Sequence, residues 1–173
     1  NLSYVTNVRA HVEKIREAMQ RNAGILFVLA AGNVNRPLGS DGLEPDRFLP
    51  AMHSPNVLVV ANAKADGSRF SESFGGSGYG QPYVDVAMRG VGLPVATVTM
   101  GYGNSRGTSS AAPNAAAAAA RCFLLNPSLS AAEVKEILIA TSEVSSYWDG
   151  LVNANGLINE AAAMHEAMNR RSN

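Results

Sequence analysis

Apolar and polar residues follow two periods at the start of this chain, one typical of a helix and one typical of a buried strand. The first period is a single apolar stripe at every third or fourth position, formed by Val8, Val12, Ile15 and Met19. The run 25–30 comes next and is apolar without polar alternation, as in a strand that is buried on both faces. A helix followed by a buried strand is typical of α/β layer folds.

Later segments show the same two patterns of apolar and polar residues. The pattern predicts further strands at 57–61, 69–74, 83–88 and 95–100. Helix formers dominate from residue 111, so helices are expected at 111–125 and 159–170. Between them, Ser130 and Glu133 have the spacing of a capping box and predict the start of another helix.

The amino-acid composition argues against several classes of function. The 173 residues include 14 Lys+Arg and 14 Asp+Glu, so the formal net charge is zero and does not favour binding to nucleic acid. A single Cys can form neither an intrachain disulfide nor a cysteine-based zinc site. No apolar run reaches the roughly 18 residues that a membrane span requires. The length suits one domain with its own hydrophobic core.

Two short motifs carry residues with catalytic chemistry. The sequence Gly-Thr-Ser-Ser-Ala-Ala-Pro at 107–113 places Ser109 on the first turn of a helix, where free N–H groups and the positive end of the helix dipole lie. A lone serine there is typical of a helix cap. Asn33 follows the first buried strand, at the edge where α/β sheets bind ligands. Its carboxamide can donate two N–H groups to an oxyanion, although a lone Asn is also typical of a turn.

In this order, the two motifs resemble those of the subtilisin-like serine peptidases. The first matches G-T-S-x-A-x-P, the pattern that carries the family's nucleophile, and the resemblance assigns that role to Ser109. The second matches A-A-G-N, and the resemblance assigns the oxyanion-hole asparagine to Asn33. It also assigns one wall of the S1 pocket to Ala30, Ala31 and Gly32. The implied fold is α/β, with a mainly parallel sheet flanked by helices in three layers.

Weaker matches extend the resemblance over 1–173, which is expected to be one domain. Ser3 resembles the serine that begins the family's substrate-lining segment, and Pro50 resembles the proline of its Tyr-Pro-Ala turn, so both are expected to bind substrate. Three positions depart from the family pattern. Tyr4-Val5 stands in place of a glycine pair, Arg89 in place of Pro, and Asn114 in place of His.

The family's base and orienting acid have no counterpart in this sequence. The family order is Asp, His, Ser, and neither a D-[ST]-G nor an H-G-T segment surrounds any Asp or any of His11, His53 and His165. The chain is therefore expected to be the C-terminal part of a subtilase catalytic domain, incomplete at its N-terminal side. It is expected to be inactive alone, because a serine hydroxyl is a weak nucleophile without a base. The partners expected are the N-terminal half of the domain and a peptide or protein substrate.

The resemblance also bears on metal binding and on the cellular compartment of the protein. The family often binds calcium, but Asp41, Glu44 and Asp46 are interpreted as a solvated loop, since their spacing does not match a ligand set. No cofactor is evident from the residues. Subtilases are commonly secreted, whereas the sequence itself indicates no compartment.

Two alternative interpretations stay open. The segment 103–107 fits G-x-S-x-G, the nucleophile elbow of α/β hydrolases, and Ser105, Asp149 and His165 follow in that family's order. Against it, the helix of an elbow begins at the serine and would have to contain Gly107. The other alternative is a non-catalytic binding or scaffold module derived from a subtilase, which the departures at Arg89 and Asn114 favour.

Overall fold

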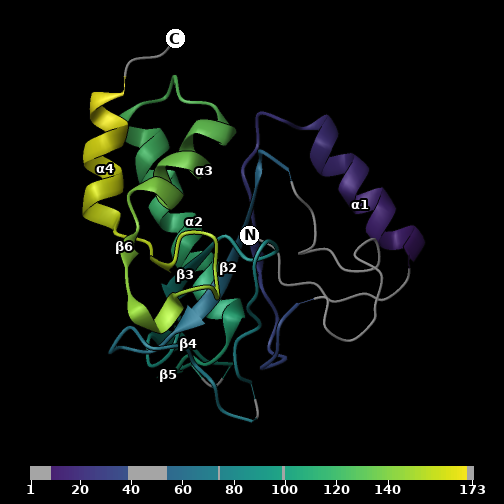
Figure 1. Cartoon of the computed structure of the whole chain (residues 1–173), viewed down its shortest axis with the longest axis vertical. Coiled ribbons are helices and arrows are strands. Elements are labelled where there is room, and N and C mark those ends of the chain that lie inside the picture. The colour runs from purple at the N-terminus through teal and green to yellow at the C-terminus, as the bar shows by residue number, and fades with distance from the viewer. Residues whose placement is uncertain (1–8, 39–53, 74, 99, 171–173) are drawn as a thin grey trace.

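A five-stranded sheet forms the centre of the protein (Figure 1). It is seen in a computed structural model that describes residues 9–38, 54–73, 75–98 and 100–170. The strand order is β1-β2-β3-β7-β6; the first four are parallel, and β6 pairs antiparallel with β7. The bounds are β1 Phe27–Ala30, β2 Val57–Ala63, β3 Val86–Arg89, β6 Glu143–Val144 and β7 Gly156–Leu157.

Helices cover both faces of the sheet, which confirms the expected three-layer α/β architecture. One face packs against α2 Thr108–Leu125, α3 Ala131–Ala140 and α4 Glu160–Asn169. The other face is covered by α1 Arg9–Arg21 and by the segment around η3, a 3-10 helix at Ser146–Trp148. Figure 1 shows α1 on the opposite side of the strands from α2, α3 and α4.

The strand β2 explains why two cores form. All seven of its residues are buried, because the sheet is covered on both faces. Successive side chains of a strand point to opposite faces. Leu58 and Val60 accordingly join the core beneath α2, while Val57 and Val59 join the core beneath α1. An apolar run without alternation is therefore the expected sequence of this strand.

The helices begin close to the predicted positions. The capping box at α3 is present, with Ser130 Oγ accepting from Glu133 N–H at 3.3 Å and Glu133 Oε2 accepting from Ser130 N–H at 2.8 Å. The helix α2 begins at Thr108, three residues before the expected start, and ends at Leu125, two residues before Pro127. Its small alanines pack beneath the sheet as part of the larger core.

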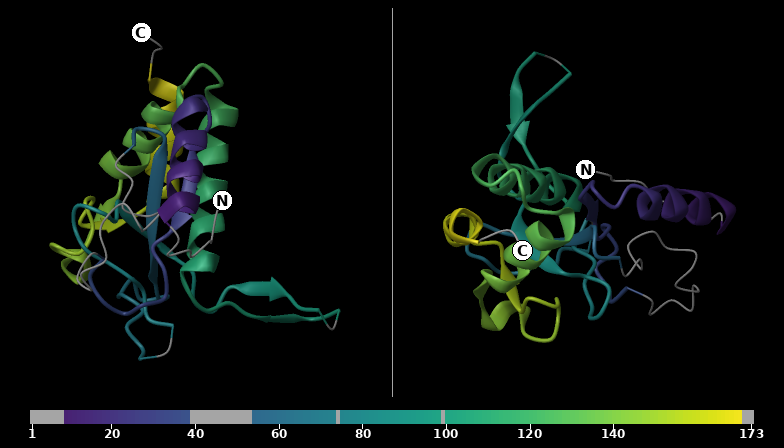
Figure 2. Two further views of the ribbon diagram at one scale, coloured as in Figure 1. Left: turned by 90° about the vertical axis from the view of Figure 1, so that its right-hand side faces the viewer. Right: turned by 90° about the horizontal axis from the view of Figure 1, so that it is seen from above.

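Two predicted strands are wrong. In its described residues, the segment 69–74 contributes only an isolated bridge between Arg69 and Ala63, and Phe70 is buried without belonging to a strand. The segment 95–100 is not one strand but part of a hairpin, with β4 Pro94–Ala96 paired antiparallel to β5 Tyr102–Asn104. This hairpin projects away from the body of the protein (Figure 2). The short strands β6 and β7 have no apolar run and were not expected.

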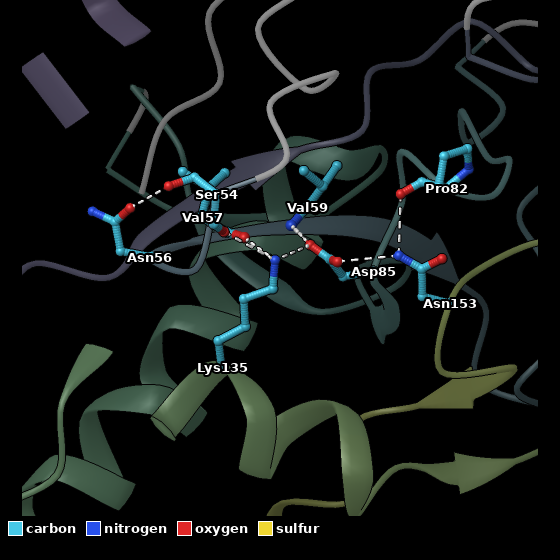
Figure 3. A network of polar contacts seen from close by, with 8 residues as sticks. All are labelled: Ser54, Asn56, Val57, Val59, Pro82, Asp85, Lys135 and Asn153. Carbon is cyan, nitrogen blue, oxygen red and sulfur yellow. Dashed lines mark hydrogen bonds and ion pairs between the residues drawn. The ribbon is translucent and has the colours of Figure 1, made fainter. Parts of the chain in front are cut away.

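A buried ion pair joins α3 to the start of the central strands (Figure 3). Lys135 Nζ lies 3.3 Å from Asp85 Oδ2, and the two side chains are only 16% and 10% exposed. The same ammonium donates to Val57 O at 2.5 Å, while Asp85 Oδ2 accepts from Val59 N–H at 2.8 Å. Asn153 Nδ2 donates to the other carboxylate oxygen at 3.2 Å. The network therefore holds one helix and two strands together.

The strand β1 lies at one edge of the sheet. It pairs with β2 from Phe27↔Val57 to Ala30↔Val60, and no other described strand pairs with it. An apolar pocket of about 390 Å³ opens beside it, lined by Gly24, Ile25, Leu26, Val28, Ala116, Ala119, Ala120 and Phe123. Among the described helices, none is both long enough and apolar enough to cross a membrane.

Candidate active site

Ser109 lies on the first turn of α2, near the end of the sheet where β1 stops, and its side chain is exposed. The first N–H groups of a helix lack partners within the helix, and the helix dipole is positive there. The hydroxyl therefore lies beside groups that stabilise negative charge, with open access to solvent.

Asn33 contacts the residue next to Ser109. Its Oδ1 accepts from Thr108 N–H at 2.8 Å and from Thr108 Oγ1 at 3.0 Å. Because a backbone N–H can only donate, this contact fixes which end of the carboxamide is the oxygen. The Nδ2 group has no partner among the described residues. Thr108 therefore holds the Oδ1 end of Asn33 at the residue before Ser109 and leaves the Nδ2 end free to donate.

Gly107 permits this close approach. Its φ of 106° lies in a region that side-chain-bearing residues rarely adopt. A Cβ atom at this position would also lie 3.0 Å from Asn33 Nδ2 and 3.1 Å from Asn33 Oδ1. A side chain at 107 would thus separate the carboxamide of Asn33 from the start of α2.

A pocket of about 330 Å³ opens beside the serine. It lies between the first two turns of α2 and the base of the β4–β5 hairpin, and is lined by Leu93, Pro94, Val95, Ser109, Ser110, Pro113 and Asn114. The lining is mostly apolar, so a peptide side chain could be buried here.

The predicted substrate-binding residues fall into two groups. Ala30 ends β1 and is half-buried, Ala31 N–H donates to Val60 O at 3.0 Å, and Gly32 O accepts from Gly78 N–H at 2.8 Å. These three residues lead directly into Asn33. Ser3 and Pro50 lie outside the described residues.

Ser105, the nucleophile of the alternative hydrolase interpretation, is buried, and its hydroxyl is already hydrogen-bonded. Its Oγ donates to Gly90 O at 2.9 Å and accepts from Leu93 N–H at 3.0 Å. A hydroxyl held in this way closes the base of the hairpin and has no access to a substrate.

Two of the three histidines lie away from Ser109. His11 is an exposed residue of α1, on the other side of the sheet from α2. His165 lies in α4, where its ring contacts Asn169 Nδ2 at 3.2 Å. The helix α4 packs on the second half of α2, since Arg121 contacts Glu160; Arg121 is about 18 Å from Ser109 along the helix axis. His53 lies outside the described residues.

Two departures from the family pattern contact each other. Asn114 Nδ2 donates to Arg89 O at 3.1 Å, which links the first turns of α2 to the end of β3. In the described part of the chain, no three His, Cys, Asp or Glu side chains are placed to hold a metal ion. Asp41, Glu44 and Asp46 lie outside it.

Comparison with known proteins identifies relatives of this chain. A family model described as the subtilase family matches residues 1–167. The chain is 31% identical over 161 residues to subtilisin-like protease 1 of Plasmodium falciparum, covering 84% of this chain and 23% of that protein. It is 33% identical over 144 residues to subtilisin of Bacillus pumilus, covering 82% of this chain and 47% of that protein. The chain thus spans half or less of the length of these relatives.

Solved structures share the fold. The A-subunit of the AB5 toxin from E. coli superimposes with a TM-score of 0.82 at 20% identity, covering 96% of this chain and 58% of that one. The prenylagaramide maturation protease PagA gives a TM-score of 0.70 at 22% identity, covering 94% of this chain and 57% of that one.

Proposed function

Because the chain belongs to the subtilase family, we propose that the protein containing it is a subtilisin-type serine endopeptidase, with Ser109 as its nucleophile and Asn33 in its oxyanion hole. One observation carries this proposal: the bond from Thr108 N–H to Asn33 Oδ1, 2.8 Å long, joins the two motifs at the residue next to Ser109. This contact supports the proposal because it holds the carboxamide of Asn33 against the residue that precedes Ser109, and both Asn33 and Ser109 are exposed.

The reaction follows from the groups at this point. Ser109 Oγ attacks the carbonyl carbon of a peptide bond while a base takes its proton. The carbonyl oxygen becomes negative and accepts from Asn33 Nδ2–H and from Ser109 N–H. The base then gives its proton to the leaving amine, and water hydrolyses the ester that remains on Ser109. Ala30 ends the strand β1, and Ala31 and Gly32 connect it to Asn33. We therefore assign these three residues to the wall that binds the substrate.

The base and its orienting acid come, in this proposal, from a polypeptide that completes the domain. This chain covers only 23% to 47% of the length of these relatives, and the outer edge of β1, which pairs with no other described strand, lies beside an apolar pocket. Further strands can pair there and extend the parallel sheet. Ile25, at the rim of this pocket, is 52% exposed and would be covered by such a partner.

A fluorophosphonate probe tests the nucleophile. We expect the complete protein to be labelled, Ser109→Ala to abolish labelling, and Ser105→Ala to retain it in the folded fraction. Labelling that survives Ser109→Ala would refute the proposal and return Ser105 to consideration. A complete, folded protein without labelling or peptide hydrolysis would favour the non-catalytic module.

The same probe tests the need for a second half. We expect the 173-residue chain to stay unlabelled alone, because without a base only residual catalysis remains. Robust labelling of the chain alone would show that the base lies within it. In the complete protein, Asn33→Ala is expected to slow labelling by about 10²–10³, the magnitude known for the loss of an oxyanion-hole donor in a subtilisin.

A further inference from the structure

Asn62 is a buried carboxamide without hydrogen bonds in the core. It is the sixth residue of β2, its side chain is 0% exposed, and neither Nδ2 nor Oδ1 has a partner among the described residues. Buried polar groups are nearly always paired, because an unpaired one loses its bonds to water and gains nothing. The position is otherwise suited to an aliphatic side chain, so the carboxamide calls for an explanation.

The carboxamide lies beneath the first turn of α2. The close approach of Gly90 shows this, since a Cβ atom there would lie 2.6 Å from Asn62 Oδ1 and 2.6 Å from Ala111 N. The oxygen and the amide nitrogen are therefore at most about 5 Å apart. Gly90 has no side chain, so the space beside both atoms stays free. Ala111 is two residues after Ser109.

The first turn of α2 differs from those of the other helices. In α3 and α4 the carbonyl of the capping residue accepts from the fourth residue that follows, in the bonds Val134 N–H to Ser130 O and Ala163 N–H to Asn159 O. In α2 the bond to the carbonyl of Gly107 comes instead from the third residue, Ser110, at 3.1 Å. This bond spans three residues, as in a 3-10 turn, although α2 is α-helical from Thr108, and Gly107 contributes no side-chain cap.

We propose that Asn62 is a positioning residue for Ser109. In the catalytically competent arrangement its Oδ1 accepts from Ala111 N–H, and the first turn of α2 moves onto the sheet until the two atoms are about 3 Å apart, the length of a normal bond. This inference rests on the proposed function of Ser109. The distance matters, because a misplacement of about 1 Å can cost a factor of 10² in rate.

The variant Asn62→Leu separates this role from a structural one. Leucine fills a similar volume but accepts no hydrogen bond, so the variant should melt at the same or a higher temperature than the unmodified protein. In the complete protein we expect fluorophosphonate labelling of Ser109 to slow at least 10-fold. We also expect the amide of Ala111 to exchange with deuterium at least 10-fold faster. Asn62→Ser, which keeps a neutral acceptor oxygen, should retain part of the protection of Ala111.

The matched control is Ser77→Ala. Ser77 Oγ accepts from the backbone N–H of Asn62 at 2.8 Å, so its removal weakens the same part of β2 while leaving the carboxamide intact. This variant should lower the melting temperature without changing the labelling rate of the folded protein. An Asn62→Leu protein that labels and exchanges like the unmodified one would overturn the inference, yet Ser109 could still be the nucleophile. If the unmodified protein is not labelled at all, the proposed function fails, and the exchange of Ala111 still tests the contact.

Discussion

The ion pair between Lys135 and Asp85 gives the sharpest prediction about stability. Lys135→Met removes the ammonium but keeps a side chain of similar length, which leaves the Asp85 carboxylate at 10% exposure without its cation. Breaking a buried pair on one side costs about 3–5 kcal/mol. Asp85 keeps its bonds from Val59 N–H and Asn153 Nδ2, so we expect the lower end, about 3 kcal/mol.

Urea and thermal unfolding measure this loss. For a domain of this size, each kcal/mol corresponds to about 2–4 °C, so the melting temperature should fall by about 6–12 °C. The control is the double variant Lys135→Met with Asp85→Asn, which removes the uncompensated charge and keeps an acceptor for Val59 N–H. It should recover at least half of the lost stability. A single variant within about 0.5 kcal/mol of the unmodified protein, or a double variant no better than the single one, would refute the reasoning.

Two further predictions concern titratable groups. Hydrogen bonds from Ser130 lower the pKa of the Glu133 carboxyl, so its stabilisation is present above the ordinary Glu pKa and is lost as the pH falls through the lowered one. Glu133→Gln should therefore flatten the fall in melting temperature below about pH 4, and an unchanged acid limb would contradict the capping box. Burial raises the pKa of the Cys122 thiol, so a disulfide reagent should react with it only on unfolding; prompt reaction of the native chain would count against the packing of α2.

The sequence predicts the fold well where burial is uniform. The strands β1, β2 and β3 have apolar runs because both faces of the sheet are covered, and these runs are visible without a structure. Helix starts with a side-chain cap are equally visible, as Ser130 and Glu133 show. The short strands β6 and β7 could not be predicted, because two residues are too few to show the alternation of a strand.

The failures have physical causes. In the described part of 69–74, Phe70 is buried without taking part in a ladder, so its apolar side chain did not indicate a strand. The segment 95–100 was predicted to be a single strand, yet its apolar residues Val98 and Met100 are fully exposed on the hairpin. Hydrophobic residues outside a core carry no signal that separates them from those inside it.

The candidate site, like the fold, could be predicted only in part from the sequence. Motifs identify Ser109 and Asn33, but neither reveals that Thr108 orients Asn33 through two bonds to Oδ1, because that contact joins residues 75 positions apart. Asn62 could not be found from the sequence either. A single Asn at the end of an apolar run is typical of a strand boundary, and only the packing of Gly90 and Ala111 brings it beneath α2.

The most direct test of the central claim is to locate a covalent adduct. The complete protein is treated with a fluorophosphonate, digested, and analysed by mass spectrometry. We predict one phosphonylated serine, Ser109, in the peptide that contains Gly-Thr-Ser-Ser-Ala-Ala-Pro. An adduct on Ser105 or on any other serine, or a folded complete protein that carries no adduct, would contradict the account.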